Sequence, residues 1–332
     1  MSGLSVQAPG AVVLIRPHRF RPNPQTRGDN GFQVRDERRD PAQLAAAAYA
    51  EVTCLADRLS QAGVRVHLFE DETASAPDSV FPNNWFSTHS GGRVAVYPMY
   101  SPSRQRERRS DILEMLKSEY RVQEIIDYSG LERDRVYLEG TGAMVVDHID
   151  RVVYAARSNR TSPAALERFC AQFHYEPMLF DAVDPAGRPI YHTNVLMCID
   201  TEFAMIGLSS ITDPVRRAQV RRRIAETGRT VVDLSEAQVR EFAGNAIELT
   251  GRDGRLLALS ARAMRALEPA QLRVIGASAN PMAVDVEAIE LAGGSVRCMI
   301  AGIHLAHRDG HPADVARSPG TGWLAEREEV PA

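Results

Sequence analysis

Apolar residues along this chain follow two spacings, which indicate strands and helices in turn. Val12–Arg16 is a short apolar run that ends at Pro17, and Val64–Phe69 alternates like a strand. Pro41–Ala62 has an Ala-rich centre and ends before Gly63, which is typical of a helix. We expect further helices at residues 103–118, 162–174, 213–227, 235–242, 261–268 and 283–290.

Short pairs of predicted strands recur along the chain, and each pair is separated by turn residues. Four pairs follow Asn84, Gly142, Asn194 and Asn245, and a further apolar segment follows Cys298. These starting points lie 51 to 58 residues apart. Self-similarity at such a period, with a hairpin and a helix in each unit, indicates a radial or stacked repeat. An α/β protein whose units merely have similar lengths is the alternative.

If the units are radial, the beginnings of the strand pairs meet at a common axis. The residues that would converge there include a thiol, an imidazole and a carboxylate, which are the groups needed for nucleophilic catalysis. They are Asn84, residues 139–142, residues 192–194, Asn245 and Cys298.

Composition narrows the class of protein without pointing to a chemistry. The chain has 332 residues, 44% of them hydrophobic, and a formal net charge of −4, as expected of a folded globular protein. The weak acidity argues against a nucleic-acid partner held by a strong basic field. We expect neither a membrane span nor a signal peptide, and therefore a cytoplasmic protein. A homodimer is the expectation from base rates.

The four cysteines are far apart and form no C-x-x-C pair, so neither a zinc site nor a thioredoxin-like site is expected. Cys298 follows two glycines, which let the backbone approach a ligand, and the neighbouring Arg297 can favour a thiolate. A buried cysteine that starts a core strand is the alternative. We expect Cys54, Cys170 and Cys198 to be structural.

A histidine and a glutamate lie at positions suited to proton transfer. His192 stands at the edge of an apolar strand, where its imidazole can be a general base or a hydrogen-bonded structural group. Glu139 lies before a glycine-rich turn, where it can orient an imidazole, bind substrate N–H groups or simply belong to the turn. Five other histidines fall in turns or in the tail and are expected to be solvated: His89, His148, His304, His307 and His311.

The string FPNNW places two adjacent amides between aromatic rings, which can bind a polar neutral group and pack its stem. Its candidate binding residues are Phe81, Asn83, Asn84 and Trp85, and an Asn-rich turn is the alternative. The basic run at residues 104–109 is typical of a solvated helical face. Arg104 or Arg108 can still clamp a substrate carboxylate, because the guanidinium fork fits it.

Four motifs, taken in their order and spacing, resemble those of the pentein superfamily of guanidine-modifying enzymes. They are FPNNWFSTH, LEGTGAM, YHTNVLMCI and GGSVRCM. The nearest resemblance is to the amidinotransferase-related family of citrulline-utilisation hydrolases. The resemblance implies an α/β fold, a five-bladed propeller of ββαβ units around a pseudo-fivefold axis. It also implies a single catalytic domain at residues 10–305, followed by a polar C-terminal tail at 306–332.

The resemblance further implies that Cys298 is the nucleophile, His192 the catalytic base and acid, and Glu139 their acidic partner, with no metal and no cofactor. Asn84 and Asn194 stand where arginine deiminases have aspartates that grip the guanidinium. A guanidinium offers only donors, whereas a ureido group offers donors and a carbonyl acceptor, which suits amides. We therefore expect citrulline to be hydrolysed to ornithine, ammonia and carbon dioxide through a covalent thiol intermediate.

Several alternatives are compatible with the same residues. Succinylarginine dihydrolases resemble the pattern in part and begin from a guanidine, so arginine deimination, two-step hydrolysis of arginine and dimethylargininase-type hydrolysis stay open. An amidinotransferase would differ only in letting an amine replace the water. A non-catalytic ligand-binding propeller is the alternative outside enzymology. The carboxylate clamp can be Arg104, Arg108 or another arginine, and Asn245 either lines the site or caps a turn.

Overall fold

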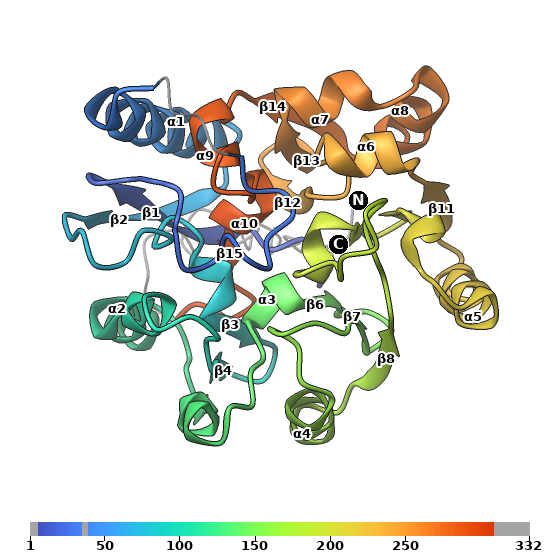
Figure 1. Cartoon of the computed structure of the whole chain (residues 1–332), viewed down its shortest axis with the longest axis horizontal. Coiled ribbons are helices and arrows are strands. Elements are labelled where there is room, and N and C mark those ends of the chain that lie inside the picture. Colours follow the sequence, from blue (N-terminus) through green and yellow to red (C-terminus); the bar gives the residue numbers. More distant parts are fainter. Residues whose placement is uncertain (1–5, 35–38, 309–332) are drawn as a thin grey trace, which may run out of the picture.

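Five three-stranded sheets are arranged around a central axis in this protein (Figure 1). The structure, a computed structural model, describes residues 6–34 and 39–308. In every sheet the middle strand pairs antiparallel with one neighbour and parallel with the other. A crossover that contains at least one helix joins each parallel pair, as parallel strands require. The five-bladed propeller of ββαβ units expected from the sequence is therefore confirmed.

Four blades follow one another along the chain, each with a hairpin, a helical crossover and a third strand. Their strands are β3 (Phe86–His89), β4 (Arg93–Val96) and β5 (Glu124–Asp127); β6 (Met144–Asp147), β7 (Val152–Ala156) and β8 (Glu176–Phe180); β9 (Met197–Ile199), β10 (Phe203–Ile206) and β11 (Thr230–Asp233); and β12 (Ile247–Gly251), β13 (Gly254–Ser260) and β14 (Asn280–Val284).

The remaining blade, which we call the first blade because it contains β1, combines strands from both ends of the described chain. Its middle strand β1 (Ala11–Pro17) pairs in parallel with β2 (Arg65–Asp71) and antiparallel with β15 (Ala301–Gly302). The strand after Cys298 thus completes the first blade instead of opening another unit, and this pairing closes the ring.

Helices cover the outer side of the blades (Figure 1). In the first blade, alternate residues of β1 face two different apolar cores: Val12 packs in the same core as α1, and Val13 in the core shared with the next blade. The helices are α1 (Pro41–Gln61), η2 (Arg104–Glu107), α2 (Ser110–Glu119), η3 (Ser129–Asp134), α4 (Pro163–Phe173), η5 (Leu208–Ser210), α5 (Pro214–Ala225), α6 (Glu236–Arg240), α7 (Ala261–Ala266), α8 (Pro269–Gly276) and α9 (Glu287–Glu290).

Most helices lie where the pattern of apolar residues predicts them, but the last predicted helix is wrong in part. Residues 283–290 contain the end of β14 and only then the short α9. The helix α8 was not predicted, although β13 and β14 are parallel and need a crossover between them. Within the described residues, no helix is long and apolar enough to cross a membrane.

A short turn precedes the first strand of each blade and brings it to the axis. These turns are η1 (Pro82–Asn84), α3 (Gly140–Ala143), η4 (Thr193–Val195), a hydrogen-bonded turn from Phe242 to Asn245, and α10 (Val296–Met299). The turn α3 contacts both η1 and η4, and α10 contacts η1. Residues that are far apart in the sequence therefore meet at one place.

Candidate active site

The turns at the axis line a small cavity. Its lining comes from four of the five blades and from the loop after β1. The lining residues are Asn30, Asp78, Phe81, Asn84, Arg104, Arg160, Tyr191, His192, Ala292, Gly294 and Cys298.

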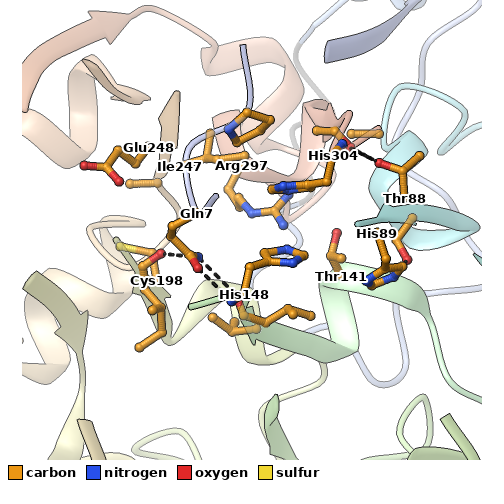
Figure 2. A pocket seen from close by; sticks show the side chains of 18 of the residues that line it. Gln7, Thr88, His89, Thr141, His148, Cys198, Ile247, Glu248, Arg297 and His304 are labelled. Carbon is orange, nitrogen blue, oxygen red and sulfur yellow. Dashed lines mark hydrogen bonds between the residues drawn. The ribbon is translucent and has the colours of Figure 1, made fainter. Parts of the chain in front are cut away.

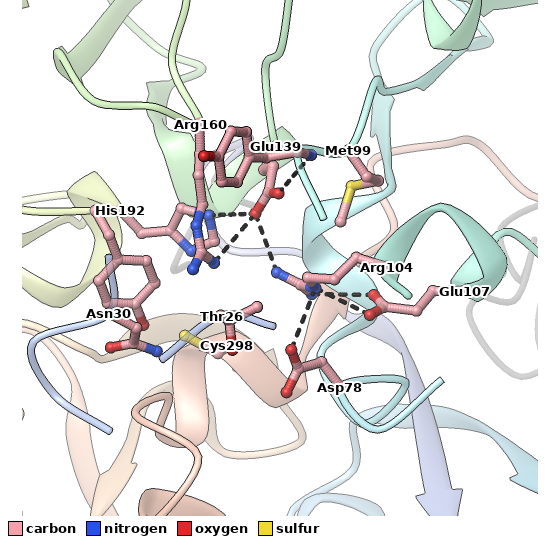
Figure 3. Close-up of polar contacts among 12 residues, drawn as sticks. Thr26, Asn30, Asp78, Met99, Arg104, Glu107, Glu139, Arg160, His192 and Cys298 are labelled. Atoms are coloured by element: carbon pink, nitrogen blue, oxygen red, sulfur yellow. Dashed lines mark hydrogen bonds and ion pairs between the residues drawn. The ribbon is translucent and has the colours of Figure 1, made fainter. Parts of the chain in front are cut away.

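An imidazole and a carboxylate form a buried pair beside this cavity (Figure 3). Glu139 lies immediately before α3 and His192 immediately before η4, and His192 Nε2 is 2.7 Å from Glu139 Oε2. Glu139 is fully buried, and its Oε1 accepts a hydrogen bond from the Tyr100 backbone N–H at 3.0 Å. An imidazole that donates Nε2–H to a carboxylate keeps Nδ1 free to take up a proton.

The two partners have opposite electrostatic surroundings. Burial lowers the pKa of His192 to about 4, and the neighbouring Glu139 offsets this only in part. Burial by itself would raise the pKa of Glu139, but the guanidinium groups of Arg160 and Arg104 outweigh it and hold the pKa well below its usual range. The resting pair is therefore a neutral imidazole beside a carboxylate, which is the state a general base requires.

The proposed nucleophile is held by two side-chain amides. Cys298 lies in α10 and is 2% exposed. Its sulfur accepts hydrogen bonds from Asn194 Nδ2 at 3.3 Å and from Asn245 Nδ2 at 3.2 Å. Such donors stabilise negative charge on sulfur and fix its position. Asn245 also accepts the backbone N–H of Arg297 through Oδ1, so one amide holds two consecutive residues of this turn.

Two amide oxygens near the sulfur lack a protein partner. Within the described residues, Asn84 Oδ1 and Asn194 Oδ1 are buried and accept no hydrogen bond. Gly142 makes room for the first of them: a Cβ there would lie 2.0 Å from Asn84 Oδ1 and 2.7 Å from His192 Nδ1. Because buried polar atoms are nearly always paired, these oxygens mark positions where ligand N–H groups can bind.

Two buried arginines reach the cavity from a cluster of carboxylates (Figure 3). Arg104 binds Glu107 at 2.9 and 3.0 Å and Glu139 at 3.0 Å. Arg160 binds Asp29 at 2.9 and 2.6 Å and lies 3.5 Å from Glu139. A guanidinium carries five N–H groups, so about two on each arginine are left for a ligand.

A buried aspartate adds a negative group next to these arginines. Asp78 is 3% exposed, and its Oδ2 accepts a hydrogen bond from Asn23 at 2.8 Å and lies 3.6 Å from Arg104 Nε. Its Oδ1 has no hydrogen-bond partner within residues 6–34 and 39–308. Burial raises the pKa of Asp78, although Arg104 opposes this shift. A ligand ammonium group would therefore stabilise the charged carboxylate.

The structure brings most of the predicted residues together. Cys298, His192, Asn84, Phe81 and Arg104 line the cavity. Glu139, Asn194 and Asn245 stand behind them and contact His192 or Cys298 directly.

Three predicted binding residues lie outside the cavity lining. Trp85 is fully buried and packs on Phe86 with ring centroids 4.4 Å apart. The Asn83 backbone carbonyl accepts the hydroxyl of Thr141. Both side chains are buried at η1 and the start of β3 and do not line the cavity. Arg108 binds Glu132 at 2.5 and 3.1 Å and the Tyr97 carbonyl, so it also points elsewhere.

Sequence reasoning missed Asp78, Arg160 and Tyr191. Asp78 lies three residues before Phe81, and this closeness to the FPNNW string is the sequence feature that could have identified it. Arg160 and Tyr191 have no such feature beside them in the sequence. All four cysteines are free, and Cys170 and Cys198 are buried as expected of structural residues. Cys54 is exposed instead. The predicted tail lies outside the described residues except at 306–308.

The family of the chain follows from comparison with known proteins. A family model described as N,N dimethylarginine dimethylhydrolase, eukaryotic, matches residues 16–305. The chain belongs to this family. It is accordingly a pentein-superfamily enzyme and a hydrolase of guanidino-type C–N bonds.

Solved structures of other penteins share this fold. The product-bound N-terminal domain of ArgZ, a cyanobacterial arginine dihydrolase, has a TM-score of 0.68 at 15% identity and covers 88% of this chain and 97% of its own. A mutant of DDAH from Pseudomonas aeruginosa, complexed with citrulline, has a TM-score of 0.60 at 14% identity. The match covers 89% of this chain and 100% of the DDAH chain. An AgrE variant with L-arginine gives 0.69 at 15%, over 90% of this chain and 41% of AgrE. No match was found among the curated proteins.

Proposed function

We propose that this protein is a cysteine hydrolase of an α-amino acid with a ureido or guanidino end, and that citrulline is its favoured substrate. The observation that carries the proposal is the mixed lining of the cavity. Two buried arginines and an aspartate line it together with a thiol, an imidazole and a neutral amide, and two further amides hold the thiol. We assign the activity to residues 10–305 acting as one catalytic domain.

The charged side chains of the cavity match the α-carboxylate and α-ammonium groups of a free amino acid. The spare N–H groups of Arg104 and Arg160 suit an α-carboxylate, and the unpartnered Oδ1 of Asp78 suits an α-ammonium group. A substrate bound in this way would extend its side chain towards Cys298, which lines the same cavity.

The neutral side-chain amides at the cavity match a ureido group. The free oxygen of Asn84, which lines the cavity, can accept a ureido N–H group, while the Asn194 amide holds the sulfur that attacks it. A ureido group is uncharged, so it needs no carboxylate beside it. Neutral amides are therefore sufficient partners for it, whereas a guanidinium gains more from carboxylates.

The reaction can proceed with groups already in the cavity. His192 first takes the proton of the Cys298 thiol, and the resulting thiolate attacks the ureido carbon. The C–N bond to the terminal nitrogen then breaks, and His192 returns that proton to the departing ammonia. The product is a thiocarbamate on sulfur. His192 then deprotonates a water that attacks the same carbon and releases the thiolate. The resulting carbamic acid of ornithine loses carbon dioxide, and Glu139 keeps the imidazole oriented throughout.

A second candidate is hydrolysis that starts from arginine or from a dimethylated arginine. The match of residues 16–305 to the dimethylarginine hydrolase family favours it. The same thiol and imidazole would release ammonia or dimethylamine and leave citrulline. Whether citrulline then reacts further depends on how well the amides hold a ureido group.

One product assay separates these functions. The purified chain is incubated in parallel with citrulline, arginine and asymmetric dimethylarginine, and ornithine, citrulline, dimethylamine and ammonia are quantified by mass spectrometry. Formation of ornithine from citrulline supports the favoured function. Citrulline that accumulates from dimethylarginine or arginine without further reaction supports the second candidate. Turnover that survives Cys298→Ala contradicts both, because both need the thiol.

A further inference from the structure

A second cavity lies between the innermost strands of the propeller and shares no lining residue with the cavity that holds Cys298 (Figure 2). It holds about 50 Å³ of free volume and is lined from β3, β6, β9, β12 and β15, with residues before β1. Its polar lining includes Gln7, Thr88, His148, Glu248, Arg297 and His304.

Arg297 points its guanidinium into this cavity (Figure 2). Its Nη1 donates to the Ile300 carbonyl at 3.0 Å, and in the described part of the chain no carboxylate forms an ion pair with it. The buried arginines differ: Arg104 binds Glu107, Arg160 binds Asp29, and Arg229 binds Asp147 and Asp150. Arg297 is partly buried, so its guanidinium gains from an anion that compensates its charge.

Two histidines stand beside this guanidinium. The rings of His148 and His304 stack with centroids 3.9 Å apart. His148 Nδ1 lies 3.1 Å from the Tyr175 hydroxyl, and in the tautomer that accepts from this hydroxyl the Nε2–H is a donor. His304 donates Nδ1–H to the Val6 carbonyl, so its Nε2 can donate after the ring takes up a proton, and a nearby anion favours that. Both side chains are half-buried between the blades, so the expectation that they are solvated is wrong in part.

Glu248 is the carboxylate in the lining of this cavity. Its Oε2 accepts the Thr201 backbone N–H at 2.8 Å and the Thr201 hydroxyl at 2.5 Å, whereas its Oε1 has no hydrogen-bond partner in the described residues and lies 3.5 Å from Arg255 Nε. Asp200 lies behind Cys198, whose sulfur donates to it at 3.3 Å. No cluster of three or more His, Cys, Asp or Glu residues in the described ranges could hold a metal ion. The donors therefore suit an anion better than a cation.

A second opening leads towards these groups. It shares Pro9, His148 and His304 with the inner cavity and is also lined by Arg65 and Arg151. Arg151 binds the backbone carbonyls of residues 173 and 174 and lies over the Tyr175 ring. A passage with several positive groups raises the local concentration of small anions.

We propose that the inner cavity is a binding site for a compact oxyanion, a carboxylate or a phosphate group, which pairs with the Arg297 guanidinium and accepts Nε2–H from His148. Guanidinium groups match both kinds of oxyanion in geometry and bind them through paired hydrogen bonds. The inner cavity shares no lining residue with the cavity that holds Cys298, so the proposal does not depend on which substrate the enzyme hydrolyses.

Histidine ring signals in long-range ¹H–¹⁵N NMR spectra test the proposal on the full chain. Inorganic phosphate and sodium acetate are titrated separately at constant ionic strength with chloride, and the signals of His148 and His304 are assigned with His→Gln variants. We expect a saturable shift of both signals, with the exposed His18 as internal reference. Phosphate or acetate acting alone would identify the kind of oxyanion. The absence of a saturable shift with either one overturns the proposal.

Two variants separate this site from the arginines of the active site. Arg160→Gln removes an anion-binding group next to Cys298 and is expected to leave the His148 titration unchanged. Arg297→Gln is expected to weaken binding about tenfold or more, as expected for loss of a charged hydrogen bond. A binding constant that Arg297→Gln leaves unchanged, or that Arg160→Gln abolishes, contradicts the assignment. If Arg297→Gln does not fold, the His304→Gln variant and the wild-type titration still decide.

Discussion

Single residues define the active cavity through hydrogen-bonding capacity that the protein leaves unused. Asp78 Oδ1, Asn84 Oδ1 and Asn194 Oδ1 are buried without partners among the described residues. Each such atom costs free energy, about 1–3 kcal/mol when left unpaired. A ligand with N–H groups at both ends would recover that energy, which is why a free amino acid with a ureido or guanidino end fits better than an apolar ligand.

The charge at position 84 is expected to set the preference between ureido and guanidinium substrates. Asn84→Asp places a carboxylate where a neutral amide now faces the cavity, so kcat/KM for arginine relative to citrulline is expected to rise about tenfold or more. Steady-state kinetics with both substrates measure this ratio. Asn280→Asp, at an exposed position of β14, is the matched control. An unchanged ratio in Asn84→Asp would mean that this amide does not select the substrate.

Removal of Arg160 is expected to weaken substrate binding more than chemistry. The Arg160→Gln variant loses a cation proposed to bind the α-carboxylate, so KM for the substrate should rise about 10- to 100-fold while kcat changes less. Arg157→Gln, which breaks an exposed ion pair with Asp181, serves as control. A lower kcat at unchanged KM would instead assign Arg160 to positioning Glu139.

At the scale of elements, the hairpins were predictable and the turns before them were not. Alternating apolar residues and glycine turns are local signals, and they located the strands that follow Asn84 and Asn245. Single helical turns such as η1 carry no periodicity of their own. The catalytic candidates Cys298, His192 and Glu139 were found through motifs. Asp78 and Arg160 reach the cavity only because separate blades pack together.

The turn α3 gives a test of how closely the blades must approach. A side chain at Gly142 would meet Asn84 Oδ1 at 2.0 Å and His192 Nδ1 at 2.7 Å. Gly142→Ala is therefore expected to displace both groups and to lower kcat/KM about 100-fold, because small displacements in an active site have such effects. Gly130→Ala is the control, since nothing lies within 4 Å of its added Cβ.

Circular dichroism and thermal unfolding check that Gly142→Ala still folds. A folded Gly142→Ala protein with wild-type kcat/KM would show that the close contact between η1 and α3 is not needed for turnover. Equal losses in the Gly142 and Gly130 variants would point to a general loss of stability instead of a local displacement.

At the scale of the whole molecule, closing the ring buries imidazoles that the sequence suggests are solvated. His89 and His148 belong to separate blades, and His304 follows β15, which closes the ring by pairing with β1. Burial lowers the pKa of each of the three, to about 4 for His304. With His192 at the other cavity, the propeller thus holds four histidines that favour the neutral state.

These histidines predict a loss of stability in mild acid. Because their pKa values are lowered on folding, the unfolded chain binds more protons below about pH 6.5, and the free energy of unfolding falls with pH. The contribution is complete above pH 6.5 and disappears as pH falls to about 4; for the buried His192 alone it amounts to about 3 kcal/mol.

Urea unfolding at pH 7.5, 6.5, 5.5 and 4.5 measures the slope of the free energy of unfolding against pH. His304→Gln is expected to reduce this slope. Burial raises the pKa of Glu51 to about 7 and of Glu107 to about 8, and these carboxyl groups stabilise the fold as pH falls, so the comparison of the variant with wild type is the test. A wild-type slope in His304→Gln would mean that this ring is not held neutral by burial.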